Sequence, residues 1–245
     1  MKLYQLLKNI KNFPKHLNGL LASNPNKNGE YKFLEDKMPK LTNASIVFDV
    51  GANIGDYAAK MHSYNNTLQI YCFEPVPDTY LKLKERVSIN KNIILNNTAI
   101  SDNVGSVKMF EYKKYGGINS IENHGELMSS ATKVINVELN TIDNYCDQHG
   151  IDKINFLKID VEGHELNVIR GAEEMIRNKS INILQFEYNY LWRNTNNTLE
   201  GVMKILSVNY DIYRLTFWGK ILIDSFDTSL ENYPHASNYV AILKT

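Results

Sequence analysis

One short segment of the chain carries an unusual density of groups that can do chemistry. Asp160-Val161-Glu162-Gly163-His164-Glu165 holds three carboxylates and one imidazole within six residues. It follows an apolar run over 154–159 that is typical of a buried strand. Carboxylates beside a buried strand are unfavourable unless they are paired or used, so this junction is a candidate functional site.

A further carboxylate, Glu187, ends the next predicted strand, which spans 181–187. It would face the same crevice as the segment after residue 159. Asp160, Glu162 and Glu187 together could bind Mg²⁺, which takes one or two carboxylates and keeps several waters. Use of the same carboxylates as proton acceptors, without a metal, is the other interpretation.

A glycine turn lies earlier in the chain, where a strand predicted over 45–50 gives way to a helix. It reads Asp49-Val50-Gly51-Ala52-Asn53-Ile54-Gly55-Asp56. A dinucleotide fingerprint would need glycine at 51, 53 and 56, and only Gly51 is present. Asp56 near a helix N-terminus would repel a pyrophosphate. A tight connection and a turn for a ligand without phosphate both fit the motif. Glu74 ends the second predicted strand and could accept both hydroxyls of a ribose.

These polar residues sit on an alternation of strands and helices. Apolar runs over 45–50, 68–73, 154–160 and 181–187 predict strands, and apolar residues at helical spacing follow most of them. Such alternation predicts an α/β fold with a parallel sheet, whose ligands bind outside the carboxyl ends of the strands. We expect an N-terminal helical extension over 1–40 and one domain over 41–245. A mobile loop is expected from 113 to about 132.

Composition narrows the classes of function. The 245 residues hold 27 basic and 27 acidic side chains, so no overall charge favours nucleic acid as a partner. Two cysteines cannot build a disulfide scaffold and fit a reducing compartment, so we expect a cytoplasmic protein. No apolar run approaches the roughly 20 residues of a membrane-spanning helix. A short amphipathic helix is predicted from the spacing of Leu3, Leu6, Leu7 and Ile10. We expect it to dock onto the body of the protein or onto the second subunit of a homodimer.

Three motifs now stand in order: the glycine turn, Phe73-Glu74-Pro75, and Leu157-Lys158-Ile159-Asp160-Val161-Glu162-Gly163-His164-Glu165. In this order and spacing the chain resembles the FkbM family of S-adenosylmethionine-dependent methyltransferases, from about residue 45 to 188. The segments 97–105 and 139–143 also resemble that family. The resemblance implies the class I methyltransferase (Rossmann-like) fold, a seven-stranded mostly parallel sheet with helices on both faces.

The resemblance also implies where S-adenosylmethionine would bind, with S-adenosylhomocysteine as product. Residues of the glycine turn would surround the methionine part, Glu74 would hold the ribose, and four later residues would lie beside the adenine. Strand packing is the competing interpretation for two of those four, Ala99 and Ile100. The expected cofactor-binding residues are Asp49, Gly51, Asn53, Gly55, Tyr57, Glu74, Ala99, Ile100, Ser101 and Asp102.

Methyl transfer to a hydroxyl needs a base to take its proton. Glu162, Asp160 and His164 are the candidates, with Glu187 facing the same crevice. The family pattern does not require a metal, so metal-free catalysis is favoured over an ion at Asp160 and Glu187. The expected acceptor-binding residues are Asn119, Ser120, His124, Tyr188 and Trp192, although Trp192 could equally fill the core.

The expected function is O-methylation of a carbohydrate or nucleotide-activated sugar, in surface polysaccharide (capsule) or other glycan biosynthesis. A carboxyl or phosphate oxygen of a small metabolite is the alternative acceptor. A non-catalytic module that binds the cofactor is the alternative outside enzymes.

Overall fold

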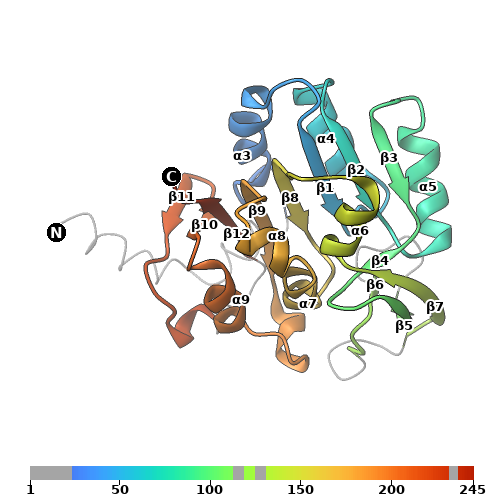
Figure 1. The fold of residues 1–245 in the computed structure, drawn as a ribbon. Helices are drawn as coiled ribbons and strands as arrows, with labels where there is room; N and C mark the ends of the chain where they lie inside the picture. Colours follow the sequence, from blue (N-terminus) through green and yellow to red (C-terminus); the bar gives the residue numbers. More distant parts are fainter. Residues whose placement is uncertain (1–23, 113–118, 125–130, 232–236) are drawn as a thin grey trace.

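The structure, a computed structural model, describes residues 24–112, 119–124, 131–231 and 237–245. Its centre is an eight-stranded sheet with the order β11-β10-β12-β9-β8-β1-β2-β3 (Figure 1). The strands of this sheet are β1 (Ile46–Val50), β2 (Gln69–Phe73), β3 (Ile93–Asn96), β8 (Phe156–Ile159), β9 (Ile183–Tyr188), β10 (Tyr210–Thr216), β11 (Gly219–Leu222) and β12 (Ser237–Leu243). Strands β3, β2, β1, β8 and β9 are parallel, and β12 lies antiparallel between β9 and β10.

The strand count differs from the predicted seven, although the arrangement matches. Seven strands form the expected mostly parallel sheet with an antiparallel last strand. The eighth, β11, pairs antiparallel with β10 and extends that edge of the sheet. Its four residues are half-buried or exposed, so the strand lacks the apolar run by which the others were predicted.

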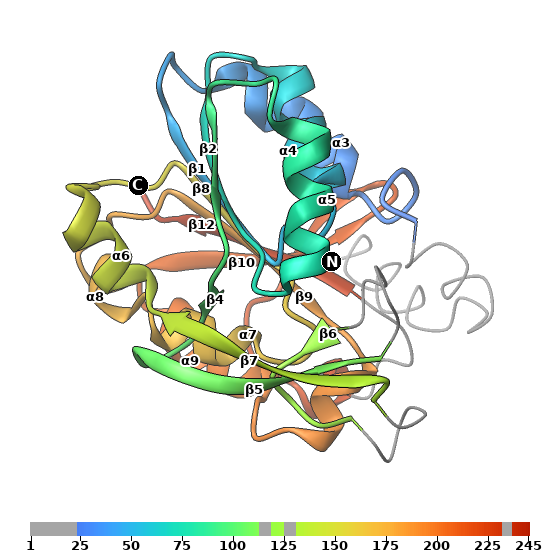
Figure 2. The same ribbon diagram turned by 90° about the vertical axis from the view of Figure 1, so that its right-hand side faces the viewer.

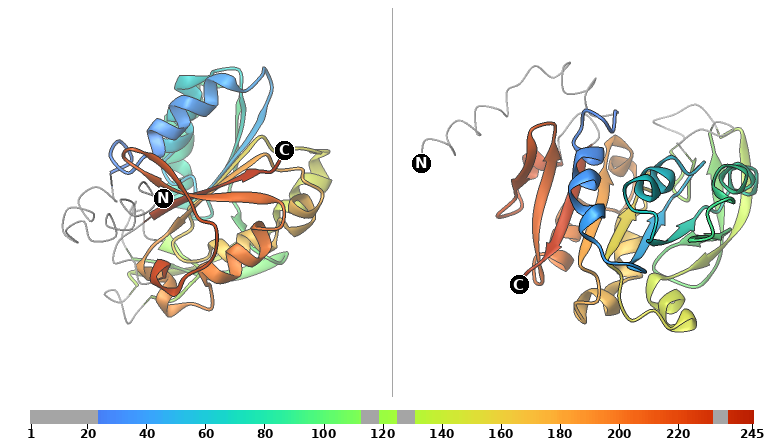
Figure 3. Two further views of the ribbon diagram at one scale, coloured as in Figure 1. Left: turned by 90° about the vertical axis from the view of Figure 1, so that its left-hand side faces the viewer. Right: turned by 90° about the horizontal axis from the view of Figure 1, so that it is seen from above.

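Helices cover both faces of the large sheet. Figure 2 shows α4 and α5 along one face and α6 to α9 along the other, and Figure 3 shows α3 beside α4. The helices are α3 (Glu30–Lys37), α4 (Asp56–Tyr64), α5 (Pro77–Val87), α6 (Ile142–His149), α7 (Glu165–Arg170), α8 (Glu173–Arg177) and α9 (Leu199–Leu206), with 3-10 turns η1 (Met38–Lys40), η2 (Tyr190–Asn194) and η3 (Thr228–Leu230). Within the described ranges, no helix combines the length and apolar character that a membrane crossing requires.

The core has two halves, one on each face of the sheet. Neighbouring residues of β1 alternate between them: Val47 packs toward α3, α4 and α5, and Phe48 packs toward α6 to α9. Phe33 and Leu34 of α3 are buried in the same cluster as Val47. Helix α3 is therefore part of the body of the protein. The predicted helix over 3–10 lies outside the described residues.

A second, four-stranded sheet lies next to the first, in the order β4-β7-β5-β6. Its strands are β4 (Ala99–Ile100), β5 (Gly105–Glu111), β6 (Asn119–Ser120) and β7 (Lys133–Asn140). Strand β6 falls inside the segment predicted as a long loop, where its two residues pair with the end of β5. Residues 113–118 and 125–130 of that expected loop lie outside the described residues.

Candidate active site

A pocket opens at the carboxyl ends of β1, β2 and β8, where the small sheet meets the large one. Its empty volume is about 540 Å³, which includes space open to solvent. Nine residues of the predicted site line it: Gly51, Asn53, Glu74, Ala99, Ile100, Asn119, Asp160, Glu162 and His164. The motifs identified from the sequence therefore meet at one place.

The glycine turn forms one wall of the pocket, and its geometry requires glycine at position 51. Gly51 has a φ of 78°, and a Cβ there would lie 1.8 Å from the backbone oxygen of Asp160. Asn53 also has a positive φ, of 48°, a conformation that asparagine tolerates better than most residues. The turn is thus a tight connection that also forms a wall of the pocket.

Glu74 is buried at the end of β2 and is held by the same turn. Its Oε2 accepts a hydrogen bond from the backbone N–H of Asn53 at 3.0 Å, and its Oε1 accepts from Val76 at 2.9 Å. Burial raises the pKa of Glu74 to about 7, although these two hydrogen bonds oppose the shift. A carboxylate has more acceptor positions than these two bonds occupy, so Glu74 can still receive ligand hydroxyls.

A buried lysine lies behind the pocket between two carboxylates. Lys158 Nζ lies 3.4 Å from Asp49 Oδ1 and 3.2 Å from Asp160 Oδ2. Burial disfavours its ammonium, but Asp160, Asp49 and Glu30 outweigh burial and raise the pKa of Lys158. The ammonium also lies 4.8 Å from the ring centroid of Tyr57, whose hydroxyl donates to Gln185. Lys158 therefore neutralises the carboxylates around it.

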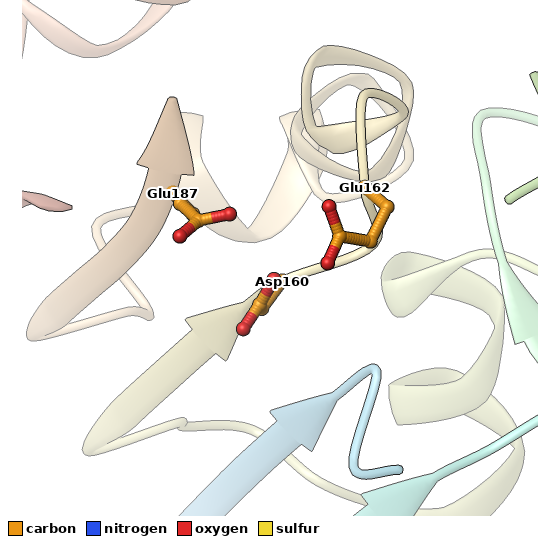
Figure 4. Close-up of side chains that lie close together, drawn as sticks. All are labelled: Asp160, Glu162 and Glu187. Atoms are coloured by element: carbon orange, nitrogen blue, oxygen red, sulfur yellow. The ribbon is translucent and has the colours of Figure 1, made fainter. Parts of the chain in front are cut away.

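Three carboxylates gather beside the pocket, as Figure 4 shows for Asp160, Glu162 and Glu187. One oxygen of each lies within 4.8 Å of the others. Asn189 Nδ2 donates to Glu162 Oε2 at 3.0 Å and to Glu187 Oε2 at 2.8 Å, so one amide holds both side chains. Burial, and then the charge of Asp160, raises the pKa of Glu162 and of Glu187 well above the usual range. The raised pKa makes Glu162 and Glu187 stronger bases than exposed carboxylates.

The loop that carries Glu162 is held in an unusual conformation. Glu162 has a φ of 56° and Gly163 one of 100°. Glu165 supports the loop from below, because its carboxylate accepts from the backbone N–H groups of Val161 and Gly163, each at 3.0 Å. A left-handed residue other than glycine costs free energy and persists where its surroundings over-determine it. Glu165 is therefore a structural residue of the site.

The segment 119–124 holds the same loop from the other side. Ser120 Oγ donates to the backbone oxygen of Glu162 at 2.8 Å, and His124 Nε2 lies 2.9 Å from that oxygen. His164 has Nδ1 at 2.8 Å from Glu122 Oε1 and Nε2 at 2.9 Å from Ser101 Oγ. Both nitrogens of His164 are thus engaged within the protein. Ser120, His124 and His164 position the loop in this structure.

The remaining predicted residues lie away from the pocket wall. Gly55 begins α4 with a φ of 87°, and Asp102 is exposed and accepts from Asn167 Nδ2. Tyr188 and Trp192 are buried in the core with ring centroids 5.1 Å apart, and the Tyr188 hydroxyl donates to the backbone oxygen of Glu231. The structure places these two aromatic rings in the core, where they do not line the pocket.

Three residues of the site were not predicted from the sequence. Asn189 follows Glu187 by two positions, and Glu122 lies in the segment predicted as a loop. Glu30 comes from α3, and it accepts from Asn238 Nδ2 of β12 at 2.7 Å. Burial, and then the charge of Asp160, raises the pKa of Glu30 to about 7, so its carboxyl belongs electrostatically to the same site. Of the three, only Asn189 lies next to the end of a predicted strand, and it is not acidic.

Comparison with protein families identifies the domain that carries this site. The FkbM methyltransferase domain matches residues 49–214, which include all the pocket-lining residues named above. The matched segment extends from the end of β1 into β10. It excludes α3 and β12, which supply Glu30 and Asn238.

Curated relatives are distant. The 2-O-methyltransferase NoeI of Sinorhizobium fredii is 28% identical over 145 residues, which cover 54% of this chain and 58% of the relative. The hexuronic acid methyltransferase AglP of Haloferax volcanii is 25% identical over 158 residues, covering 64% of this chain and 62% of the relative. The match thus spans less than two thirds of each relative's length.

A solved structure shares the fold. A Clostridium thermocellum protein described as an rRNA methylase matches over 89% of this chain and 98% of its own, with a TM-score of 0.51 and 9% identity. At that identity the likeness shows the fold alone. It confirms the predicted class I methyltransferase fold.

Proposed function

The chain belongs to the FkbM methyltransferase family, and from this membership we propose that it methylates a hydroxyl of a carbohydrate or nucleotide-activated sugar. S-adenosylmethionine is the proposed methyl donor. The names of the two relatives support this acceptor class, because one is a 2-O-methyltransferase and the other acts on hexuronic acid. Surface polysaccharide or other glycan biosynthesis in the cytoplasm is the setting we propose.

The residues of the pocket fit the donor. The buried Oδ1 of Asn53 has no hydrogen-bond partner within the described residues, and it belongs to a pocket-lining side chain. We propose that Gly51 and Asn53 contact the methionine part, that Glu74 accepts the ribose hydroxyls, and that Ala99 and Ile100 lie beside the adenine. When bound, S-adenosylmethionine supplies a methyl group on a positively charged sulfur.

The observation that carries the proposal is the carboxylate cluster at the pocket. A hydroxyl is a weak nucleophile, and a positioned base contributes typically 10²–10⁴-fold to such a reaction. We propose that Glu162, which lines the pocket, takes the proton of the acceptor hydroxyl as its oxygen bonds to the methyl carbon. Burial, and then the charges of Asp160 and Glu165, would raise the proton affinity of Glu162. Positioning of the two reactants would supply most of the remaining acceleration.

The test is release of S-adenosylhomocysteine over a panel of nucleotide-activated sugars and simple glycosides, with calorimetry of cofactor binding in parallel. Turnover of a sugar hydroxyl, with the methyl group located on oxygen by mass spectrometry, would support the proposal. Turnover restricted to carboxyl or phosphate compounds would overturn the acceptor. Cofactor binding without turnover of any compound would favour the non-catalytic module, and absence of cofactor binding would overturn the proposal entirely.

A further inference from the structure

The wall of the pocket is rich in carboxyl groups and in hydrogen-bond acceptors. Glu74, Asp160 and Glu162 line it, and Glu187 lies beside the last two. Among the residues that the structure describes, no lysine or arginine lines this pocket. Asn53 and Asn119 each add a buried side-chain oxygen that no hydrogen bond satisfies within those residues.

The cation behind the pocket is already paired with carboxylates of the protein. Lys158 is 5% exposed, and its ammonium lies between Asp49 and Asp160 at 3.4 and 3.2 Å. An anionic ligand beside Asp160 would therefore meet the two carboxylates that already pair with Lys158. The lysine offers such a ligand little net attraction.

The hydrogen-bond donors next to the carboxylate cluster also contact partners within the protein. The amide nitrogen of Asn189 donates to Glu162 and Glu187. The hydroxyl of Ser120 donates to the backbone oxygen of Glu162, and both nitrogens of His164 are within hydrogen-bond distance of protein partners. A carboxylate or phosphate entering the cluster would have to displace one of these contacts to gain any of these donors, and burial of an unpaired charge is costly.

From this arrangement we infer that the pocket selects an acceptor molecule whose sugar ring is neutral or cationic. The ring would donate hydrogen bonds to the oxygens of the pocket wall. A neutral hexose or an amino sugar meets the condition, whereas a uronate ring does not. The inference rests on the proposed function and makes its substrate class narrower. It also separates this chain from its relative AglP, whose name specifies hexuronic acid.

The test compares glycosides that differ only in the charge of the ring. Methyl glucoside, methyl glucosaminide and methyl glucuronide, with the corresponding galactose series, would be assayed for S-adenosylhomocysteine release. Binding would be measured by calorimetry in the presence of S-adenosylhomocysteine. We expect kcat/KM and affinity to be at least about tenfold lower for the uronate than for the neutral or amino member of its series.

A variant tests the cause of the discrimination. Glu187→Gln removes one charge and keeps a side chain that can contact Asn189, so we expect it to narrow the difference in affinity between glucoside and glucuronide by about threefold or more. Glu200→Gln is the matched control, because Glu200 pairs with Lys204 on the exposed surface of α9. It should leave the ratio unchanged.

Each outcome has a defined meaning. Equal or better binding and turnover of the uronate would overturn the inference while leaving sugar methylation standing. If Glu187→Gln does not change the preference for glucoside over glucuronide, the carboxylate cluster is not the cause of that preference. If neither these glycosides nor the nucleotide-activated sugars bind or react, the proposed carbohydrate function fails, and the inference fails with it.

Discussion

His164 and Glu122 are joined by a 2.8 Å contact between Nδ1 and Oε1, which links the loop after β8 to the segment 119–124. Sequence reasoning placed His164 among the candidate bases. In the structure its other nitrogen lies 2.9 Å from Ser101 Oγ, so the imidazole bridges two protein side chains. The contact indicates that His164 positions the loop that carries Glu162.

Removal of the Glu122 carboxylate should loosen this loop. We expect Glu122→Ala to lower kcat about tenfold, with little change in cofactor affinity, because misplacement of reacting groups is costly. Glu122→Gln keeps an oxygen that can accept from Nδ1–H and should restore most of the activity. Equal losses in the two variants would contradict a positioning role. The partly exposed Glu122–His164 pair should add less than about 1 kcal/mol to the free energy of unfolding.

The strand-end residues were predictable because their position follows from the topology. Asp49, Glu74, Asp160 and Glu187 each end a predicted strand, and parallel strands present their carboxyl ends at one edge of the sheet. The fold class followed from the same alternation of strands and helices. Both predictions depend on local patterns along the chain.

The rest of the site depends on contacts between distant segments. Asn238 meets Glu30 across 208 positions of sequence, and Glu122 meets His164 across 42. No periodicity or motif marks such pairs. Trp192 was expected at the pocket, but an aromatic ring near a strand end can equally line a pocket or fill a core. The structure places this ring in the core.

Glu30 should make the protein less stable as the pH rises. Its pKa is about 7 in the folded chain and near 4.5 when unfolded, so the folded state binds the proton more tightly. The stabilisation is complete below pH 4.5 and is lost as the pH rises through about 7. Glu30→Gln should therefore raise the free energy of unfolding at pH 8 by roughly 3 kcal/mol and change it little at pH 4.5.

Urea unfolding at the two pH values measures this effect. Glu35→Gln is the matched control, because Glu35 is exposed on the same helix. A Glu30→Gln variant that is destabilised equally at both pH values would contradict the prediction, since it would show that the contribution of Glu30 to stability does not depend on its ionisation.

Gly51 should not tolerate alanine. An added Cβ would lie 1.8 Å from the Asp160 oxygen, so the glycine turn and the end of β8 would have to separate. We expect cofactor affinity to fall more than about tenfold and the free energy of unfolding to fall by roughly 3 kcal/mol or more. Gly150→Ala is the control, because Gly150 has a φ of 62° with nothing within 4 Å. It should cost only about 1–2 kcal/mol. Equal effects in the two variants would show that the close approach at Gly51 is unimportant.

Metal removal should leave turnover intact. The oxygens of Asp160, Glu162 and Glu187 lie close enough to hold an ion, but Lys158 and Asn189 already contact all three side chains. We expect the rate of S-adenosylhomocysteine release to be the same with EDTA and with added Mg²⁺. Loss of activity in EDTA that Mg²⁺ restores would assign a metal to this cluster.

The pH dependence of the reaction should identify the base. Glu162 accepts a proton only when ionised, and burial and Asp160 raise its pKa well above 4.5, so kcat should rise with pH through that raised value. Glu162→Gln should lower kcat by about 10²–10⁴-fold while changing cofactor affinity less than about threefold. Glu187→Gln removes a neighbouring negative charge, which lowers the pKa of Glu162 and moves the rise in kcat to lower pH. If Glu187→Gln leaves the pH dependence of kcat unchanged, or if Glu162→Gln keeps full activity, another group takes the proton.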